Sequence, residues 1–174
     1  IDGWIGEYLA QPAHNHLGPG FAGKAWAAHL IGFSSGDDSL YQELKRHIGP
    51  FHWTPLEAFL QGEGPSDVRP EELTVVSWAL AQSEEAKAGN RRETFYPSEA
   101  WARARAYGQD CNRALHVALV EVLRDGGYAA VAPALLSSWS EQETSERFGH
   151  ASTWSERHVA YASGLGTFGL SGGL

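Results

Sequence analysis

The sequence predicts an α+β fold in which helices pack on a small sheet, within a single domain spanning residues 1–174. Three observations favour this class. Residues 98–124 carry apolar side chains at helical spacing, whereas residues 73–81 and 128–132 are short apolar runs typical of buried strands. With 174 residues, 43% of them hydrophobic, the chain is long enough to bury one core.

The first third of the chain changes pattern twice. Residues 1–21 mix aromatic residues with Gly, Pro and His and predict an irregular start, and residues 22–31 are expected to form a short helix. Residues 38–47 predict an amphipathic helix, because aliphatic side chains recur there at every fourth position. Gly49 and the proline after it end that helix.

Start and stop signals define the other helices. Thr54 as N-cap, a proline at the first helical position and Glu57 predict a short helix over residues 55–60. The polar residues 62–70 and the charged residues 82–97 are expected to be surface loops.

The last two helices carry similar signals. Gly126 and Gly127 end the long helix. Thr153 and Glu156 have capping-box spacing and predict a helix over residues 154–163.

Composition excludes several classes of protein. Lys and Arg number 13 against 21 Asp and Glu, and the resulting net charge of −8 argues against nucleic-acid or anionic-lipid binding. No apolar run reaches the ~20 residues of a membrane span, and no signal peptide is recognisable, so we expect a cytoplasmic protein. Cys111, the one cysteine, falls on an apolar helical stripe and is expected in the core.

The histidines raise a metal-site question. His14 and His16 are spaced as two ligands on one face of a strand, but no third ligand accompanies them, so a surface loop is the favoured interpretation and no metal site is predicted. His47 and His52 flank Gly-Pro and are expected to pack or cap.

The hexapeptide GLGTFG matches G-x-G-x-x-G at Gly164, Gly166 and Gly169. A dinucleotide loop needs a strand before it and a helix opening at the third glycine, whereas here a helix is expected before the motif. Two interpretations stay open. Either Gly164 caps the helix and a plain turn follows, or the bare backbone lets a flat cofactor lie against it.

The terminal stretch SERHVAYASGLGTFGLSGGL resembles a segment of the epoxyqueuosine reductase family and of the related corrinoid-dependent reductive dehalogenases. It is most similar to divergent epoxyqueuosine-reductase-like iron–sulfur proteins. Residues 29–59, 73–81 and 104–133 match in the same order, so the resemblance covers nearly the whole chain, with the terminal motif as its most specific part.

The resemblance implies a nitroreductase-like core that holds cobalamin. In those families a ferredoxin-like domain with two [4Fe–4S] clusters delivers electrons to cobalt, and the reduced cobalt drives a two-electron reduction of the substrate. The corrin ring would lie on the backbone of the glycine motif, and the first turn of the last helix would border it. The cofactor-binding residues implied here are Arg157, His158, Gly164, Leu165, Gly166, Thr167 and Gly169.

Two departures from the family pattern shape the catalytic assignment. The clustered cysteines are missing, so we expect this chain to be the N-terminal, cobalamin-binding part of a longer protein that carries the iron–sulfur domain. His150 stands where the family has an acidic proton donor, and Tyr161, one turn from Arg157, is a second catalytic candidate. Tyr107 and Asp110, in a stretch resembling the family's R-x-Y-G-x-D, are further candidates to face the pocket.

The function expected is therefore that of a cobalamin-dependent oxidoreductase. Its substrate would be a small or unknown molecule, and its electrons would come from an iron–sulfur domain or protein. Two alternatives stay open: a non-catalytic binding or interaction domain, and a flavin-dependent nitroreductase-like enzyme.

Overall fold

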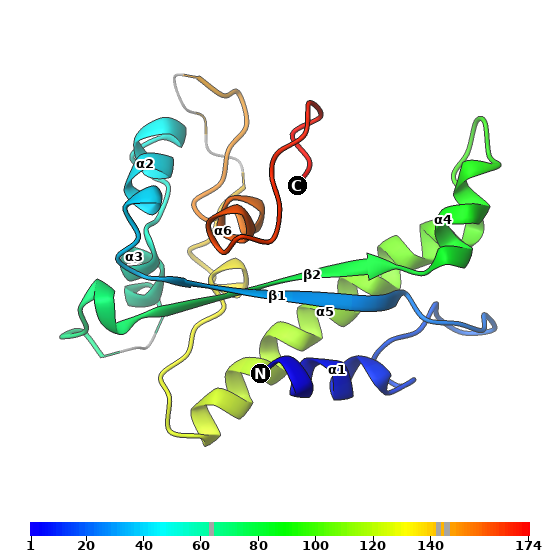
Figure 1. The fold of residues 1–174 in the computed structure, drawn as a ribbon, viewed down its shortest axis with the longest axis horizontal. Helices are drawn as coiled ribbons and strands as arrows, with labels where there is room; N and C mark the ends of the chain where they lie inside the picture. The colour runs from blue at the N-terminus through cyan, green and yellow to red at the C-terminus, as the bar shows by residue number, and fades with distance from the viewer. Residues whose placement is uncertain (63–64, 142–143, 145–146) are drawn as a thin grey trace. The chain divides into compact units, whose positions relative to one another are not determined.

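The computed structural model describes residues 1–62, 65–141, 144 and 147–174. Helices and strands are mixed, as the α+β prediction requires. The strands β1 (Trp26–Ser35) and β2 (Thr74–Gln82) pair in a two-stranded antiparallel sheet (Figure 1). The predicted strand over residues 73–81 is thus confirmed.

The chain divides into two compact units, each described by itself. Unit 1 comprises residues 1–30 and 79–119, and unit 2 comprises residues 31–78 and 120–174. Both strands contribute residues to both units, as does the long helix α5 (Glu99–Asp125). The prediction of a single domain stays a prediction.

Unit 1 begins with a helix that the sequence did not indicate. The helix α1 (Asp2–Ala10) has no side-chain cap at Ile1 and contains two glycines, which lower its intrinsic helix propensity. Its buried face, Ile5, Tyr8 and Leu9, supplies the stabilisation instead. The prediction of an irregular start was therefore wrong for this stretch.

The predicted helix over residues 22–31 is also wrong, because Trp26 begins β1. The side chain of buried Asn15 accepts a hydrogen bond from the Trp26 amide (2.9 Å) and donates one to its carbonyl oxygen (2.8 Å). The Trp26 indole donates to the carbonyl oxygen of Gly108 on α5 (3.0 Å). These tertiary contacts override the helix preference of an alanine-rich stretch.

One cluster in the core of unit 1 is built largely from small side chains. The helix α4 (Glu84–Arg91) falls inside the stretch expected to be a loop, and the Ser83 hydroxyl caps it by accepting from the Ala86 amide (3.2 Å). Ala86 and Ala104 are both fully buried, which brings α4 and α5 close together. The core cluster comprises Leu17, Ala25, Ala86 and Ala104, with Phe21, Trp26 and Ala100 packed against it.

Unit 2 contains the two helices that the sequence predicted best. The helix α2 (Ser39–Ile48) is capped by Asp38, and α3 (Pro55–Leu60) begins with the expected capping box between Thr54 and Glu57. Gly127, with φ of 86°, follows the end of α5 as predicted. Two 3-10 turns, η1 (Pro70–Glu72) and η2 (Pro133–Leu135), complete the short elements.

The last elements of unit 2 agree with the sequence-based prediction only in part. The helix α6 (Glu156–Ala162) is confirmed, but its N-cap Ser155 makes no side-chain cap, so the predicted capping box was wrong. The Thr153 hydroxyl accepts from the Ser140 amide instead (3.1 Å). Residues 128–132 are not a strand; the Ala130 carbonyl oxygen accepts from the Arg124 guanidinium (3.0 Å). Residues 63–64 of the expected loop over 62–70 lie outside the described residues.

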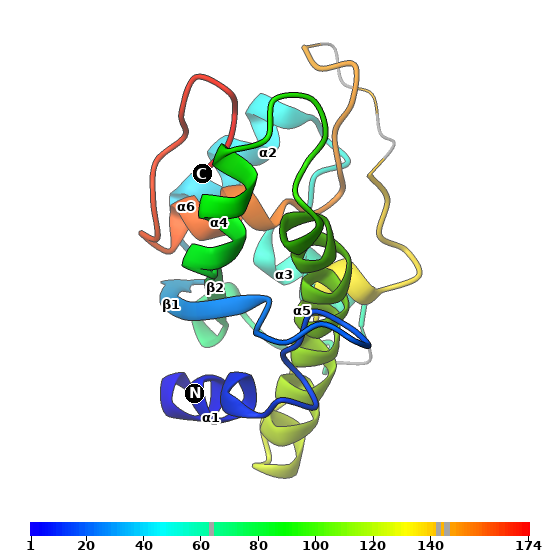
Figure 2. The ribbon, with the colours of Figure 1, turned by 90° about the vertical axis from the view of Figure 1, so that its right-hand side faces the viewer.

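Aromatic rings fill the core of unit 2. Tyr41 on α2 stacks on Trp154, just before α6, at 6.5 Å between ring centroids, and α2 contacts α6 directly (Figures 1 and 2). The cluster comprises Tyr41, Ala58, Trp154 and Val159, with Leu44, Trp53, Val75, Trp139 and Ala162 packed against it. Across the described part of the chain, no helix combines the length and apolarity that a membrane crossing requires.

Candidate functional site

A chain of hydroxyl groups anchors the end of α6 inside unit 2. The Ser34 hydroxyl lies 2.7 Å from that of Tyr41 and 3.2 Å from that of Ser163, which in turn donates to Ser77 (3.2 Å). Burial raises the pKa of Tyr41, which keeps its phenol protonated. The chain links β1, α2, β2 and the residue that immediately precedes Gly164.

Gly32 on β1 explains why α6 comes so close to the strand. A Cβ atom at Gly32 would lie 2.5 Å from the Ser163 carbonyl oxygen and 2.9 Å from the Leu165 side chain. Any larger residue would therefore push the end of α6 away. No sequence pattern indicates this role of Gly32, because a lone glycine in a strand has several explanations.

The glycine segment, defined as residues 164–169, begins with a Schellman motif. Gly164 has φ of 74°, its amide donates to Tyr161 (3.0 Å), and the Leu165 amide donates to Ala160 (3.0 Å). The predicted capping role of Gly164 is confirmed. No heavy atom lies within 4 Å of a Cβ placed at Gly164, so this point of the segment faces open space.

The residues beyond Gly164 fold back on themselves. The Gly169 amide donates to the Gly173 carbonyl oxygen (2.8 Å), and the Arg157 guanidinium donates to the Gly172 carbonyl oxygen (2.6 Å). The Leu174 side chain lies 3.3 Å from the Cβ position of Gly166. Arg157 therefore fixes the terminal turn to the first turn of α6.

His158 lies between the glycine segment and a buried histidine. Its ring centroid is 4.9 Å from that of Phe168 and 6.1 Å from that of His52, and its Nδ1 is 2.8 Å from the Ser155 hydroxyl. Burial, with the nearby charges of His52, Arg157 and His47, lowers the pKa of His158 to about 4. At neutral pH this imidazole is uncharged and suits a hydrogen-bond acceptor or metal ligand rather than an acid.

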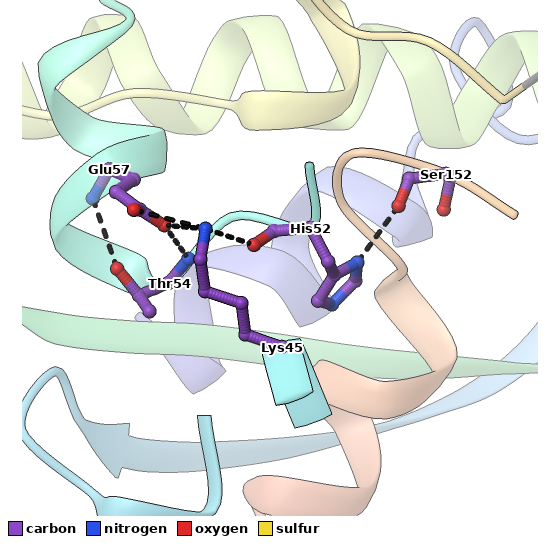
Figure 3. Close-up of polar contacts among 5 residues, drawn as sticks. All are labelled: Lys45, His52, Thr54, Glu57 and Ser152. Carbon is purple, nitrogen blue, oxygen red and sulfur yellow. Dashed lines mark hydrogen bonds and ion pairs between the residues drawn. The ribbon is translucent and has the colours of Figure 1, made fainter. Parts of the chain in front are cut away.

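A polar cluster on the other side of His52 holds that ring in place (Figure 3). The His52 Nδ1 hydrogen-bonds the Ser152 carbonyl oxygen (2.8 Å), and the Lys45 ammonium donates to the His52 carbonyl oxygen (2.9 Å). Lys45 also pairs with Glu57 (2.9 Å). Burial lowers the pKa of His52, so both histidines of the pair favour the neutral form.

The sum of contacts on Glu57 favours its charged form. Burial opposes ionisation, but hydrogen bonds from Lys45 and from the Thr54 amide outweigh it and lower the pKa of the carboxyl group. This cluster therefore unites α2, α3 and the residues before α6 around a paired charge. The sequence indicated the Thr54–Glu57 cap but not the lysine that joins it.

The predicted catalytic residues occupy different environments. Tyr161 is 39% exposed and its ring lies 5.5 Å from that of Phe168, so it borders the glycine segment as expected. His150 is exposed, and among the described residues no contact joins it to the glycine segment. The structure brings Arg157, His158 and Tyr161 together with the glycine segment but leaves His150 apart from them.

The remaining candidates belong to unit 1. Tyr107 packs against Gly18, where a Cβ atom would come within 2.1 Å of the ring, and Asp110 is exposed on α5. Cys111 is buried, as predicted, and burial raises the pKa of its thiol to about 11. The His14 ring stacks on Tyr8 at 4.0 Å.

Within the described ranges, no group of three or more His, Cys, Asp and Glu side chains is arranged to hold a metal ion.

The glycine segment offers a flat ligand an open face rather than an enclosed slot. Gly164, Thr167, Phe168 and Gly169 are all exposed. A macrocycle would fit this segment only by lying on its surface, with the neutral His158 and the Tyr161 phenol at its edge.

Comparison with known proteins assigns no family: no family model, no curated protein and no solved structure matches the chain, so the resemblance of its terminal stretch stays a prediction.

Proposed function

We propose that unit 2 binds cobalamin on the exposed face of the glycine segment, and that the chain is the cobalamin-binding region of an epoxyqueuosine-reductase-like oxidoreductase with a nitroreductase-like core. Electrons would come from a partner iron–sulfur domain or protein. Bound cobalamin would supply the two-electron reducing chemistry that amino-acid side chains lack.

One observation carries the proposal. The open backbone at Gly164 follows the C-terminus of the short helix α6, and the same helix carries His158, an imidazole that stays uncharged at neutral pH and whose ring contacts Phe168 of the glycine segment. A bare backbone permits close approach of a planar group, and a neutral imidazole can accept a hydrogen bond or bind a metal. A plain turn needs only the first of these two features.

The surrounding residues have positioning roles in this proposal. The hydroxyl chain through Ser163 and the close contact at Gly32 fix where the segment begins, and Arg157 fixes where it turns back. Preorganised backbone of this kind reduces the entropy lost on binding. His158 and Tyr161 would orient the ligand edge, and the Tyr161 ring lies 5.5 Å from that of Phe168 in the segment.

The test is a titration of the protein with hydroxocobalamin, followed by visible absorbance and by calorimetry. We expect saturable binding with a shift of the corrin bands. The variant Gly169→Val adds bulk to the exposed face without a clash, because the nearest atom to its Cβ would be 3.7 Å away. We expect it to weaken binding by about tenfold or more, as a lost close contact does.

A matched control is Gly3→Val. Gly3 also has nothing within 4 Å of its Cβ position, but it lies on α1 in unit 1. The Gly3→Val variant should bind cobalamin with the same affinity as the wild type. Absence of saturable binding by the wild type, or equal loss in both variants, would refute the proposed site.

The second candidate function, an interaction domain, is favoured by the exposed apolar side chains of the same region. Leu170 is fully exposed at 112% and Phe168 is 37% exposed. Such side chains suit a protein partner as well as a cofactor. Failure of cobalamin binding, combined with concentration-dependent association that Leu170→Ser abolishes, would favour this function instead.

A further inference from the structure

Unit 1 contains a half-open cavity of about 120 Å³ between α1 and the beginning of β1. The helix contributes Gly6 and Leu9, and the strand contributes Trp26 and Ala28. Figures 1 and 2 both show α1 running beneath the first residues of β1, which belong to the same unit. The walls therefore mix apolar side chains with polar side-chain and backbone atoms in similar proportion.

Two basic side chains also line this cavity, and their surroundings differ. The His29 Nε2 lies 3.0 Å from the Asp2 carboxylate, so this ring already has an acidic partner. Lys24 is exposed and forms no ion pair with any residue in the described ranges. The other two lysines, Lys45 and Lys87, pair with glutamates. Lys24 is thus the lysine left to meet an external anion.

The volume limits what can bind. A cavity of about 150 Å³ accommodates benzene, which has six carbon atoms. A cavity of about 120 Å³ with one open side therefore suits a ligand of similar or slightly smaller size. A mixed wall that includes Leu9 and Trp26, beside the ammonium of Lys24, which is unpaired within the described residues, suits a small anion with a short hydrocarbon tail.

We propose that unit 1 binds a short-chain aliphatic carboxylate of about four carbon atoms, a size set by the cavity. Its carboxylate pairs with the Lys24 ammonium, and its alkyl chain lies between Leu9 and Trp26. The site is separate from the glycine segment and does not depend on cobalamin binding.

The test uses sodium butyrate as the probe, with the ¹H–¹⁵N spectrum of the full chain as the readout. We expect saturable shifts at Gly6, Ala28 and their neighbours, with a Kd of about 1 mM, as suits so small a ligand. Butylamine has a similar tail but the opposite charge and should not shift these signals. Equal shifts with butylamine, or none with butyrate, would overturn the proposal.

Two variants separate the charge from the shape. Lys24→Gln should weaken butyrate binding by about tenfold, because a charge-assisted hydrogen bond is lost, whereas Lys87→Gln should leave binding unchanged. Gly6→Leu should abolish binding, since a Cβ at Gly6 already lies 3.4 Å from the His29 ring. If Gly6→Leu lowers the melting temperature, Ala28→Leu fills the cavity from the opposite wall instead and should also abolish butyrate binding. Unchanged butyrate affinity in Lys24→Gln would overturn the proposal.

Discussion

Units 1 and 2 satisfy their buried polar groups in opposite ways. In unit 1 a single amide side chain, Asn15, is 1% exposed and makes three hydrogen bonds to the backbone of Leu9 and Trp26. In unit 2 several polar side chains are buried, among them His52, Thr54 and Ser77, and they share their contacts with neighbouring hydroxyl groups and the partly exposed Lys45–Glu57 pair. Polar contacts concentrated on one residue make it irreplaceable, whereas contacts spread over a network allow partial compensation.

The buried apolar side chains of the two units differ as well. In unit 1 they are mainly aliphatic, and Ile5, Leu17 and Leu115 are buried together with several alanines. Tryptophans and tyrosine fill the core of unit 2. Large rings bury more area per residue, and their polar edges can join a hydrogen-bond network, as the Tyr41 hydroxyl does.

The largest effect should come from Asn15→Leu. Leucine is similar in size but removes the side-chain partner of the Trp26 amide and of the Leu9 and Trp26 carbonyl oxygens, which should cost about 4 kcal/mol of unfolding free energy. Urea denaturation measures this loss. The nearby exposed Gln11→Leu is the control and should change stability by less than about 0.5 kcal/mol. Similar losses in both variants would contradict the concentrated role of Asn15.

Gly32→Ala tests the close contact in unit 2. The added methyl group would overlap the Ser163 carbonyl oxygen at 2.5 Å, and we expect a loss of about 3 kcal/mol. The same denaturation experiment applies, with the open position Gly149→Ala as control. A wild-type stability for Gly32→Ala would show that the end of α6 can move away from β1 freely.

The pH dependence of stability should report His158. Its pKa is about 4 in the folded chain against 6.5 for a free imidazole, so the unfolded chain takes up the proton first as the pH falls. Stability is fully present above pH 6.5 and decreases between pH 6.5 and about pH 4. We expect a loss of about 2 kcal/mol, allowing for the partial exposure of the ring.

The control for this prediction is His158→Gln. His52, whose pKa is lowered by burial, contributes in the same direction and stays present in that variant. The variant should therefore retain a shallower pH dependence. An identical pH profile in His158→Gln would assign the whole effect to other groups.

The smallest effect should come from Thr54→Ala. The Thr54 hydroxyl accepts one hydrogen bond from the Glu57 amide (3.3 Å), whereas Lys45 continues to hold the Glu57 carboxylate. We expect a loss of about 1 kcal/mol, typical of an N-cap. Thermal unfolding detects it, with the exposed Thr94→Ala as control. A loss as large as that of Asn15→Leu would contradict the shared network.

Local signals predicted the elements that depend on local chemistry. The cap at Thr54, the apolar stripe of α5 and the glycine at Gly164 each act within a few residues, and all three were confirmed. The elements that were wrong depend on distant partners. The β1 strand begins where Asn15 binds the backbone of Trp26.

The candidate site likewise contains residues that local sequence places correctly and residues that only the folded chain brings together. Arg157, His158 and Tyr161 lie near the glycine segment because one helix carries them to it. His52, by contrast, lies more than 100 positions before His158, and only the folded chain brings the two rings within 6.1 Å. Its environment could not be read from its neighbours in sequence.

The amide of Asn15 has one more consequence, for contacts between molecules. A strand with a free edge can recruit a strand from another chain, and aggregation begins in this way. At Trp26 the Asn15 side chain occupies both the donor and the acceptor that an incoming strand would need. The backbone of the first residue of β1 is thereby closed to intermolecular pairing. The Asn15→Leu variant would expose these backbone groups at the strand edge and would aggregate more readily, in addition to being less stable.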